Sequence, residues 1–451
     1  MKKYIVLIII ATTILFYSTA CGSRYEYVED DLYFVEEVHY EAQHYEAAQH
    51  YETSHYEDVF SSGRTRQEYL DDLDFLYNSL VENFPFFGAI YRGMGVDMHS
   101  YYLEKRERLE TIDDILCDLS FAMQVNGQFL GRAREWGHLH MFIDGSHTSF
   151  LRLHLEAFNY DVHNGDGIFV NFLAELDNPA TRALHNLSDE HFAAPTPTEQ
   201  SVIYATHSNN IETEILEEGR IAYLNIHSMD FATMHIDEVT LLDFFHEVAD
   251  YEHLIIDIRQ NVGGYNRFFP NLIIAPNISE SLEWEYYLFL MGGEHNNHML
   301  TPWMGALGEG YFQQVDYAVI AQLPYLSQED IPLLDYYFHA VNTIYPSLQS
   351  PIFGGKIWLL VSEWVFSSSE QAAIMTQQTG FATLVGQTTG GDGLGFQPIV
   401  LTLPNTGIVV RYSAAYGVDN LGRNNQEFAT TPCIYNMPDK DALQTVLYLI
   451  G

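Results

Sequence analysis

The sequence predicts an α/β protein of the α+β kind, in which a sheet with helices packed on it follows an α-helical N-terminal part. In the C-terminal half, short runs rich in β-branched residues alternate with stretches of helical period, a pattern typical of a sheet covered by helices. Between about residues 65 and 125, apolar residues instead recur every three or four positions, which is the period of an amphipathic helix.

The composition indicates a globular protein with a hydrophobic core and an acidic surface. Of the 451 residues 47% are apolar, and 20 Lys and Arg stand against 61 Asp and Glu, which gives a formal net charge of −41. Such a charge repels the phosphates of nucleic acids, so no nucleic acid partner is expected. Cys117 and Cys433 lie far apart in the sequence, and two buried thiols explain them as well as a disulfide does.

The N-terminus has the features of an export signal. Lys2 and Lys3 precede an apolar run, Tyr4 to Phe16, that is too short for a stable membrane span. It ends in Ser18-Thr19-Ala20-Cys21-Gly22, which resembles the lipobox of bacterial lipoproteins except that Ser18 replaces the usual Leu. An ordinary secretory signal is the alternative. We expect a signal peptide over residues 1–20, a lipid on Cys21, and an extracytoplasmic protein anchored to the bacterial cell membrane.

The chain divides into four further segments. In residues 21–63 the tripeptide His-Tyr-Glu recurs four times; such a short repeat cannot bury a core, so we interpret it as a linker. Its histidines have no spacing that imposes a metal geometry. Residues 64–150 are predicted to form a helical domain, residues 151–215 a connecting region without clear assignment, and residues 216–451 the sheet-and-helix core.

The helical domain is predicted from three amphipathic runs. The first begins after Thr65 and stops before Pro85, the second covers Met98 to Leu109, and the third begins at Asp113, a residue suited to a helix N-cap. In the core, β-branched and apolar runs predict strands at 219–226, 253–258, 356–362 and 382–386. Helices are predicted at 241–249 and, following Phe366-Ser367-Ser368-Ser369-Glu370, through Gln378.

Two features at strand ends point to acyl-transfer chemistry. Ser367 stands between a predicted strand and a helix N-terminus, where backbone N–H groups and the helix dipole stabilise negative charge. Gly263-Gly264 directly follows another predicted strand, and its unobstructed N–H groups can supply a second donor if the two strands are neighbours. A helix N-cap and a simple turn are the plain explanations of each feature alone. Together, on neighbouring predicted strands, they favour a site.

Three motifs resemble the signature of the C-terminal-processing, or tail-specific, serine peptidases. They are Ile256-Asp257-Ile258-Arg259-Gln260-Asn261-Val262-Gly263-Gly264, Phe366-Ser367-Ser368-Ser369-Glu370 and Val385-Gly386-Gln387-Thr388-Thr389-Gly390-Gly391. The resemblance spans roughly Gly219 to Gly451. It implies a polypeptide substrate, no cofactor, Ser367 as nucleophile, and the N–H groups of Gly264 and Ser368 as oxyanion donors.

One departure from the family concerns the base. Many members carry a lysine within a Gly-Lys-Gly turn, and this chain has Gly391-Asp392-Gly393 there. The tricorn-like branch uses instead a histidine from the N-terminal region. That resemblance implies His138 as the base, with His147 as the alternative and His140 as a further competitor, and Glu427 as the orienting acid. Activity is then expected to rise with pH through roughly 6 to 7, where a histidine loses its proton.

Two other functions compete with a serine peptidase. A metal hydrolase would use His138, His140 and His147 as ligands, but the chain has no His-Glu-x-x-His motif and the serine and glycine motifs would stay unexplained. A catalytically inactive protein that binds peptides or other ligands on a protease scaffold is the second rival, because a fold does not guarantee a function. The missing lysine is its main support. Labelling of Ser367 by an active-site serine probe distinguishes these possibilities.

Overall fold

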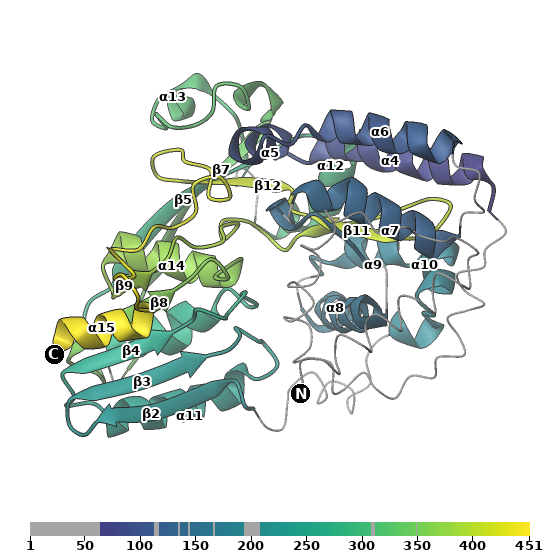
Figure 1. Ribbon diagram of the computed structural model, residues 1–451. Helices are drawn as coiled ribbons and strands as arrows, with labels where there is room; N and C mark the ends of the chain where they lie inside the picture. Colours follow the sequence, from purple (N-terminus) through teal and green to yellow (C-terminus); the bar gives the residue numbers. More distant parts are fainter. Residues whose placement is uncertain are drawn as a thin grey trace.

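The computed structural model describes residues 64–111, 117–133, 136–142, 145–165, 167–193, 208–307, 312–348 and 350–451. The predicted signal peptide, the lipidation site at Cys21 and the His-Tyr-Glu segment lie outside these residues. Figure 1 shows a helical N-terminal part beside a six-stranded sheet, and strands of the C-terminal region run from one to the other. The predicted fold class is confirmed.

The N-terminal part is built from helices joined by short turns. Thr65 caps the first helix with a capping box, in which its side chain and that of Glu68 bind each other's backbone N–H groups. The elements in order are α4 (Arg66–Asn83), α5 (Phe87–Met94), α6 (Met98–Thr111), α7 (Asp118–Gln128), η4 (Leu130–Ala133), η5 (Trp136–His138), β1 (His140–Phe142), α8 (Gly145–Asn164), α9 (Val170–Leu176), α10 (Pro179–Leu184) and η6 (Asp189–His191).

Two parts of this region differ from the sequence-based expectation. Asp113 lies outside the described residues, and α7 begins at Asp118 because Cys117 caps it through a capping box with Ser120. The connecting region contains helices α8, α9 and α10; Asn178 caps the last of these, which begins with Pro179. Helix α8 crosses residue 150, and the domain boundaries at 150 and 215 remain predictions.

The C-terminal half is organised around a six-stranded sheet with strand order β13-β9-β8-β4-β3-β2. Neighbouring strands are parallel except for β2, which is antiparallel to β3. The strands are β2 (Ile211–Glu217), β3 (Ile221–Ile226), β4 (His253–Asp257), β8 (Lys356–Val361), β9 (Thr383–Gly386) and β13 (Ile434–Tyr435), and helices α11 (Met234–Glu247), α14 (Ser368–Thr379) and α15 (Ala442–Ile450) accompany them.

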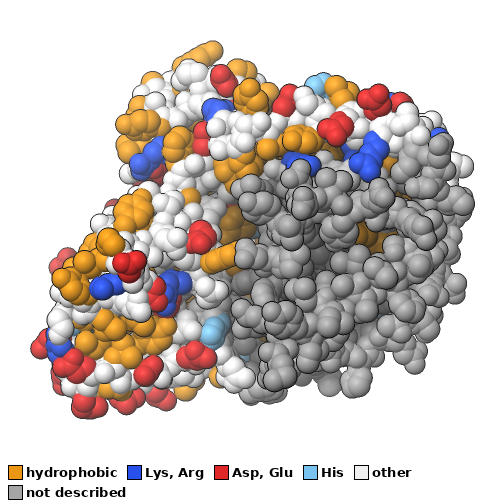
Figure 2. All heavy atoms as spheres, viewed as in Figure 1, with side chains coloured by type: hydrophobic (Ala, Val, Ile, Leu, Met, Phe, Trp, Pro, Cys, Tyr) orange, Lys and Arg blue, Asp and Glu red, His pale blue; other side chains and the backbone are white. Residues whose placement is uncertain are grey.

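Both faces of the central strands are buried, which explains their continuous apolar sequences. On β4, Leu254 and Ile256 belong to the main core, whereas Ile255 points to the opposite face and packs in a smaller cluster with Trp358 and Val446 of α15. Figure 1 shows α15 crossing this second face, and Figure 2 shows hydrophobic side chains gathered beside it. The carboxyl ends of β4 and β8 therefore lie side by side in a rigid layer.

Two smaller antiparallel sheets connect the six-stranded sheet to the helices. The sheet β1-β11-β10 pairs a strand of the N-terminal part with β10 (Ile399–Thr402) and β11 (Val409–Tyr412). The sheet β12-β5-β7-β6 contains β5 (Leu282–Leu290), β6 (Gln313–Gln314), β7 (Tyr336–Ile344) and β12 (Ala415–Asp419). The remaining elements are η8 (Phe269–Ile274), η9 (Ala275–Asn277), α12 (Glu294–Leu307), α13 (Tyr317–Ile320) and η10 (Ile331–Leu333).

Two observations bear on the remaining expectations. Cys433 is a free, exposed cysteine, so both explanations offered for the cysteines are wrong for it: it is neither paired with Cys117 nor a buried thiol. In the described ranges of the chain, no helix is long and apolar enough to cross a membrane.

Candidate active site

Ser367 lies at the turn between β8 and α14, at the carboxyl edge of the sheet. Its backbone has φ 54° and ψ −125°, a conformation that residues with a side chain rarely adopt. The turn is held by the pairing of Phe366 with Gly391 and by the Ser367 N–H group, which donates to the Gly391 carbonyl at 3.2 Å. This backbone places the Ser367 side chain at the N-terminal end of α14.

The glycine pair lies against the same helix end. Strands β4 and β8 are parallel neighbours, with Leu254 opposite Ile357 and Asp257 opposite Leu360, so the predicted adjacency of these strands is confirmed. Gly263 has φ 112°, and a Cβ atom added there would stand 2.8 Å from the Ser368 nitrogen. The Ser368 hydroxyl donates to the Gly264 carbonyl at 2.7 Å. The glycine turn and the start of α14 therefore touch, and only glycine allows this approach.

A buried asparagine, which the sequence interpretation gave no role, fixes the glycine turn. The Asn261 Oδ1 atom accepts hydrogen bonds from the Gly263 N–H at 2.9 Å and from the Ser369 hydroxyl at 2.6 Å. Its Nδ2 atom donates to the Ile226 carbonyl of β3 at 3.0 Å. Asn261 thus ties three elements together. Its position two residues before the glycine pair is typical of an Asx turn and was the available signal.

The N–H groups of Gly264 and Ser368 are the candidate oxyanion donors. Gly264 is exposed, and Ser368 is the first residue of α14, where backbone N–H groups have no partner within the helix. Within the described part of the chain, neither group donates a hydrogen bond to the protein. Two free donors beside a serine side chain can bind the negative oxygen of a tetrahedral intermediate.

His138 is the imidazole that reaches Ser367. Its Nε2 atom lies 3.2 Å from the Ser367 Oγ atom, although the two residues are 229 positions apart in the sequence. Pairing of β1 with β11 brings the His138 turn to the Ser413 region, where the Ser413 N–H donates to the Gly137 carbonyl at 2.6 Å. The side chain is buried and lies beside the Phe366 ring, at 4.8 Å between centroids.

The other ring nitrogen of His138 meets a carboxylate and a second serine. The Nδ1 atom is 2.5 Å from Asp392 Oδ2 and 3.1 Å from Ser413 Oγ. The Ser413 hydroxyl also donates to Asp392 Oδ2 at 3.3 Å. A buried carboxylate at Nδ1 favours the tautomer with the proton on Nδ1, which leaves Nε2 as an acceptor for the Ser367 hydroxyl.

Comparisons with known proteins agree with this geometry. Residues 220–435 match the family model described as peptidase family S41. The C-terminal half of the chain is thus similar to S41 peptidases, which are serine-type; residues 220–435 are called the S41-like region below. No curated protein matches the chain.

Several solved structures are similar to this chain at low sequence identity. The structure described as mature CPAF complexed with lactacystin has a TM-score of 0.50 and 14% identity, over 82% of this chain and 94% of that chain. A putative peptidase from Parabacteroides merdae has a TM-score of 0.49 and 16% identity, over 86% of this chain and 96% of that chain. A lipoprotein from Streptococcus agalactiae has a TM-score of 0.40 and 11% identity, over 86% of this chain and 97% of that chain. The similarity to mature CPAF indicates a common fold and nothing further.

The acid that contacts the histidine is not the one expected. Glu427 pairs with Arg92, whose Nη2 atom is 2.9 Å from Glu427 Oε2. Asp392, at the position of the family's lysine, contacts His138 instead. The expectation for Glu427 is therefore corrected: the Asp392 turn pairs with the Ser367 turn, whereas Glu427 is held by the helical part.

The other two candidate histidines stand elsewhere. His140 is on β1, paired in register with Arg411, and its ring lies 5.2 Å from that of Phe142. His147 is in helix α8, and its side chain lies outside the described residues. In the ranges that the structure describes, no group of three or more His, Cys, Asp or Glu side chains is arranged to hold a metal ion.

A buried acid, Glu370, lies beneath the Asp392 turn and supports it. Glu370 is fully buried, and this burial raises the pKa of its carboxyl group, which favours the neutral form. Its Oε1 atom accepts from the Asn425 side chain and from the Thr430 N–H and hydroxyl. Asn425 in turn accepts a hydrogen bond from the Gly393 N–H at 2.6 Å. Glu370 therefore holds one end of the Asp392 turn from below.

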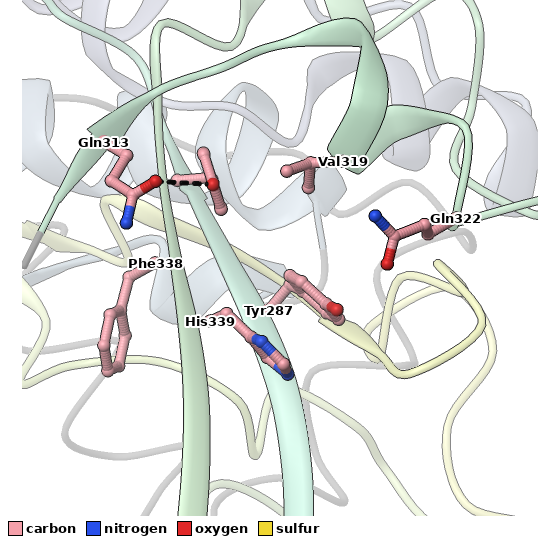
Figure 3. Close-up of a pocket in the computed structure, with 7 residues that line it drawn as sticks. Tyr287, Gln313, Val319, Gln322, Phe338 and His339 are labelled. Carbon is pink, nitrogen blue, oxygen red and sulfur yellow. Dashed lines mark hydrogen bonds between the residues drawn. The ribbon is translucent and has the colours of Figure 1, made fainter.

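A separate cavity of about 370 Å³ lies on the sheet that contains β5 and β7 (Figure 3). The Tyr287 and His339 rings stack in it with centroids 4.1 Å apart, and Tyr337 donates to Gln313 Oε1 at 2.7 Å. Its remaining lining residues are Val319, Gln322 and Phe338. It shares no residue with the group around Ser367.

Proposed function

We propose that this protein is a serine peptidase that hydrolyses polypeptides through an acyl-enzyme on Ser367. His138 is the base, Asp392 with Ser413 orients it, and the N–H groups of Gly264 and Ser368 bind the oxyanion. The observation that carries the proposal is the 3.2 Å separation between His138 Nε2 and Ser367 Oγ, which is within hydrogen-bond reach. The S41 match of residues 220–435 supports a polypeptide substrate.

The chemistry follows from these positions. His138 Nε2 takes the hydroxyl proton as Ser367 Oγ bonds to the substrate carbonyl carbon, and the negative oxygen turns toward the two N–H groups. The imidazolium then gives this proton to the amide nitrogen, so the C–N bond breaks and the amine leaves. Water repeats the sequence on the ester, with His138 again as base. Asp392 stabilises the imidazolium without taking a proton itself.

A fluorophosphonate probe, followed by mass spectrometry of the labelled peptide, tests the nucleophile. We expect labelling on Ser367, none after Ser367→Ala, and loss of peptide hydrolysis in that variant. Absence of labelling and of hydrolysis in the wild-type protein would instead favour an inactive binding protein on a protease scaffold.

Three histidine variants test the base. His138→Ala should reduce turnover nearly as much as Ser367→Ala, because members of one catalytic unit fail together. His140→Ala, two positions further along the chain, and His147→Ala serve as controls and should keep activity. Loss in His147→Ala with full activity in His138→Ala would move the base to His147. Retention in all three would exclude a base among these histidines.

We also propose that the mature protein begins at Cys21, carries a lipid there and is anchored to the outside of a bacterial cell membrane. The small residues before Cys21 support this proposal. Mass spectrometry of protein taken from its native membrane should find a lipid-modified Cys21 at the N-terminus. An unmodified N-terminus at another residue would refute the anchor.

A further inference from the structure

A single buried side chain links the two turns that carry the proposed base and its acid. The Gln426 Oε1 atom accepts a hydrogen bond from the Gly137 N–H at 3.2 Å. The Gln426 Nε2 atom donates to the Gly390 carbonyl at 3.1 Å. The side chain is 4% exposed, so neither bond competes with bulk water.

Both partners of this amide are next to proposed catalytic residues. Gly137 directly precedes His138, and Gly390 is the neighbour of Gly391, whose carbonyl binds the Ser367 N–H. The amide therefore spans the gap between the histidine turn and the turn that contains Asp392. Among the residues whose contacts are described, Gln426 is the side chain that binds the backbone of both turns.

The segment around Gln426 is itself fixed on several sides. The Asn424 Oδ1 atom accepts from the N–H groups of Gln426 and Glu427 at 3.1 and 3.0 Å. Asn425 binds the Gly393 N–H at the far end of the Asp392 turn. Arg92 of the helical part holds the Glu427 carboxylate. The segment that carries Gln426 is thus held by contacts to the Asp392 turn and to the helical part.

The catalytic turns need such support because their backbones are unfavourable. His138, Asp392 and Ser367 have φ values of 52°, 53° and 54°, a region that residues with a Cβ atom seldom occupy. Such conformations persist only where surrounding contacts hold them. A displacement of either turn would change the distance between His138 Nδ1 and Asp392 Oδ2. Because the imidazole ring is rigid, it would also change the position of Nε2 relative to the Ser367 Oγ atom.

We propose that Gln426 is a positioning residue that sets the distance between the histidine turn and the acid turn. The inference rests on the proposed peptidase function. It assigns to Gln426 an effect on turnover and on the reactivity of Ser367, without any contact to substrate. Substrate binding should therefore change little when the amide is removed.

The test compares two glutamine variants that lose the same kind of contact. Gln426→Met keeps the side-chain volume and removes both hydrogen bonds. Gln378→Met is the matched control, because Gln378 binds the Glu285 N–H and carbonyl through the same two atoms, each at 2.9 Å, at the opposite end of α14. We measure kcat and KM with a fluorogenic peptide, the rate of Ser367 labelling by a fluorophosphonate, and Tm.

We expect Gln426→Met to lower kcat and the labelling rate by about 10²-fold with KM within about twofold, as a misplaced catalytic group does. Gln378→Met should keep kcat. Gln426→Asn keeps the amide on a side chain one methylene shorter, which cannot span both turns but adds no buried charge, so its kcat should fall between those of the wild type and Gln426→Met. This variant decides the question if Gln426→Met does not fold.

The outcomes separate the two proposals. If the wild type turns over substrate and Gln426→Met matches Gln378→Met in kcat and labelling rate, the positioning role is wrong and the peptidase proposal stands. A rise in KM with unchanged kcat would also overturn it, because that pattern indicates a substrate contact. If the wild-type protein neither turns over substrate nor labels at Ser367, both proposals fall.

Discussion

At the scale of single residues, three turns with unfavourable backbone conformations contact one another in the site. Ser367, His138 and Asp392 all have positive φ, and glycine neighbours His138 on one side and Asp392 on both. Glycine lets the chain enter and leave such a turn with little strain. Surrounding contacts hold the three functional residues in these conformations. One of them is the hydrogen bond that the Gly390 N–H donates to the Val365 carbonyl at 2.8 Å.

Asp392→Asn tests which acid orients the histidine. The amide cannot stabilise an imidazolium as a carboxylate does, so kcat should fall on the order of 10²- to 10⁴-fold. Glu427→Gln is the control, since Glu427 binds Arg92, and its kcat should fall less than about tenfold. Steady-state kinetics on one peptide provides both values. A larger loss in Glu427→Gln would restore Glu427 as the orienting acid.

Lys105 predicts a pH dependence of stability. Burial lowers the pKa of this lysine to about 8, and its ammonium group donates to Gln128 Oε1 at the end of α7. In the unfolded chain a lysine titrates near 10.4, so between these values the unfolded state binds more protons. The free energy of unfolding should therefore rise as pH rises from about 8 to about 10.4, and this gain is lost as pH falls through 8.

The measurement for Lys105 is urea unfolding of the wild type and of Lys105→Met at several pH values from 7 to 10. Methionine does not titrate, so the difference between the two chains isolates the lysine. We expect the wild type to gain free energy of unfolding relative to the variant as pH increases. Parallel pH profiles would show that the ammonium group is not destabilised by burial.

At the scale of elements, helix α5 is tied to the C-terminal region by one guanidinium group. Arg92 pairs with Asp330 at 2.6 Å and with Glu427 at 2.9 Å, and the Asp330 side chain is 2% exposed. Tyr416 of β12 also donates to Asp330 at 2.7 Å. These contacts join the helical part to the segment that contains Gln426.

Arg92→Met should destabilise the protein because it leaves the buried Asp330 carboxylate without its cation. We expect the free energy of unfolding to fall by about 3 kcal/mol, measured by urea denaturation. Arg106→Met is the matched control: Arg106 pairs with the more exposed Asp74 and Glu110, and such surface pairs contribute about 0–1 kcal/mol. Equal losses in both variants would contradict a special role for the Arg92 contacts.

At the scale of the whole molecule, the helical part and the S41-like region share one hydrophobic core. A single cluster of buried residues runs from Tyr69 of α4 to Val418 of β12. Aromatic pairs cross between the parts: the ring of Phe84 lies 6.0 Å from that of Tyr412, and the ring of Phe86 lies 5.6 Å from that of Tyr416. A shared core predicts that the two parts unfold together.

Phe86→Ala tests this cooperativity. Phe86 is 1% exposed, and its loss should lower the free energy of unfolding by about 3–5 kcal/mol while Trp fluorescence and far-UV circular dichroism still report one common transition. Phe75→Ala on α4, where the side chain is 39% exposed, is the control and should have a small effect. Two separate transitions in the wild type would show that the parts unfold independently.

Local sequence patterns predicted the features that depend on neighbouring residues. Apolar runs predicted the strands at 253–258 and 356–362. A serine at a strand end and a glycine pair indicated Ser367, the helix after it, and Gly264. Each of these signals lies within a few positions of the sequence. Helices α8 to α10 were not predicted, because Leu151, Leu153 and Leu155 of α8 alternate with polar residues as in a strand, and α9 and α10 are short.

The tertiary structure alone decided which side chains meet Ser367. Three histidines within ten residues offered equivalent local patterns, and the pairing of β1 with β11 selected His138. Asp392 contacts this histidine across 254 positions of sequence, and Gln426 reaches Gly137 across 289. Contacts at such separations depend on strand register and on the packing of a whole core, and a shift of one residue in β1 would turn its side chains to the opposite face.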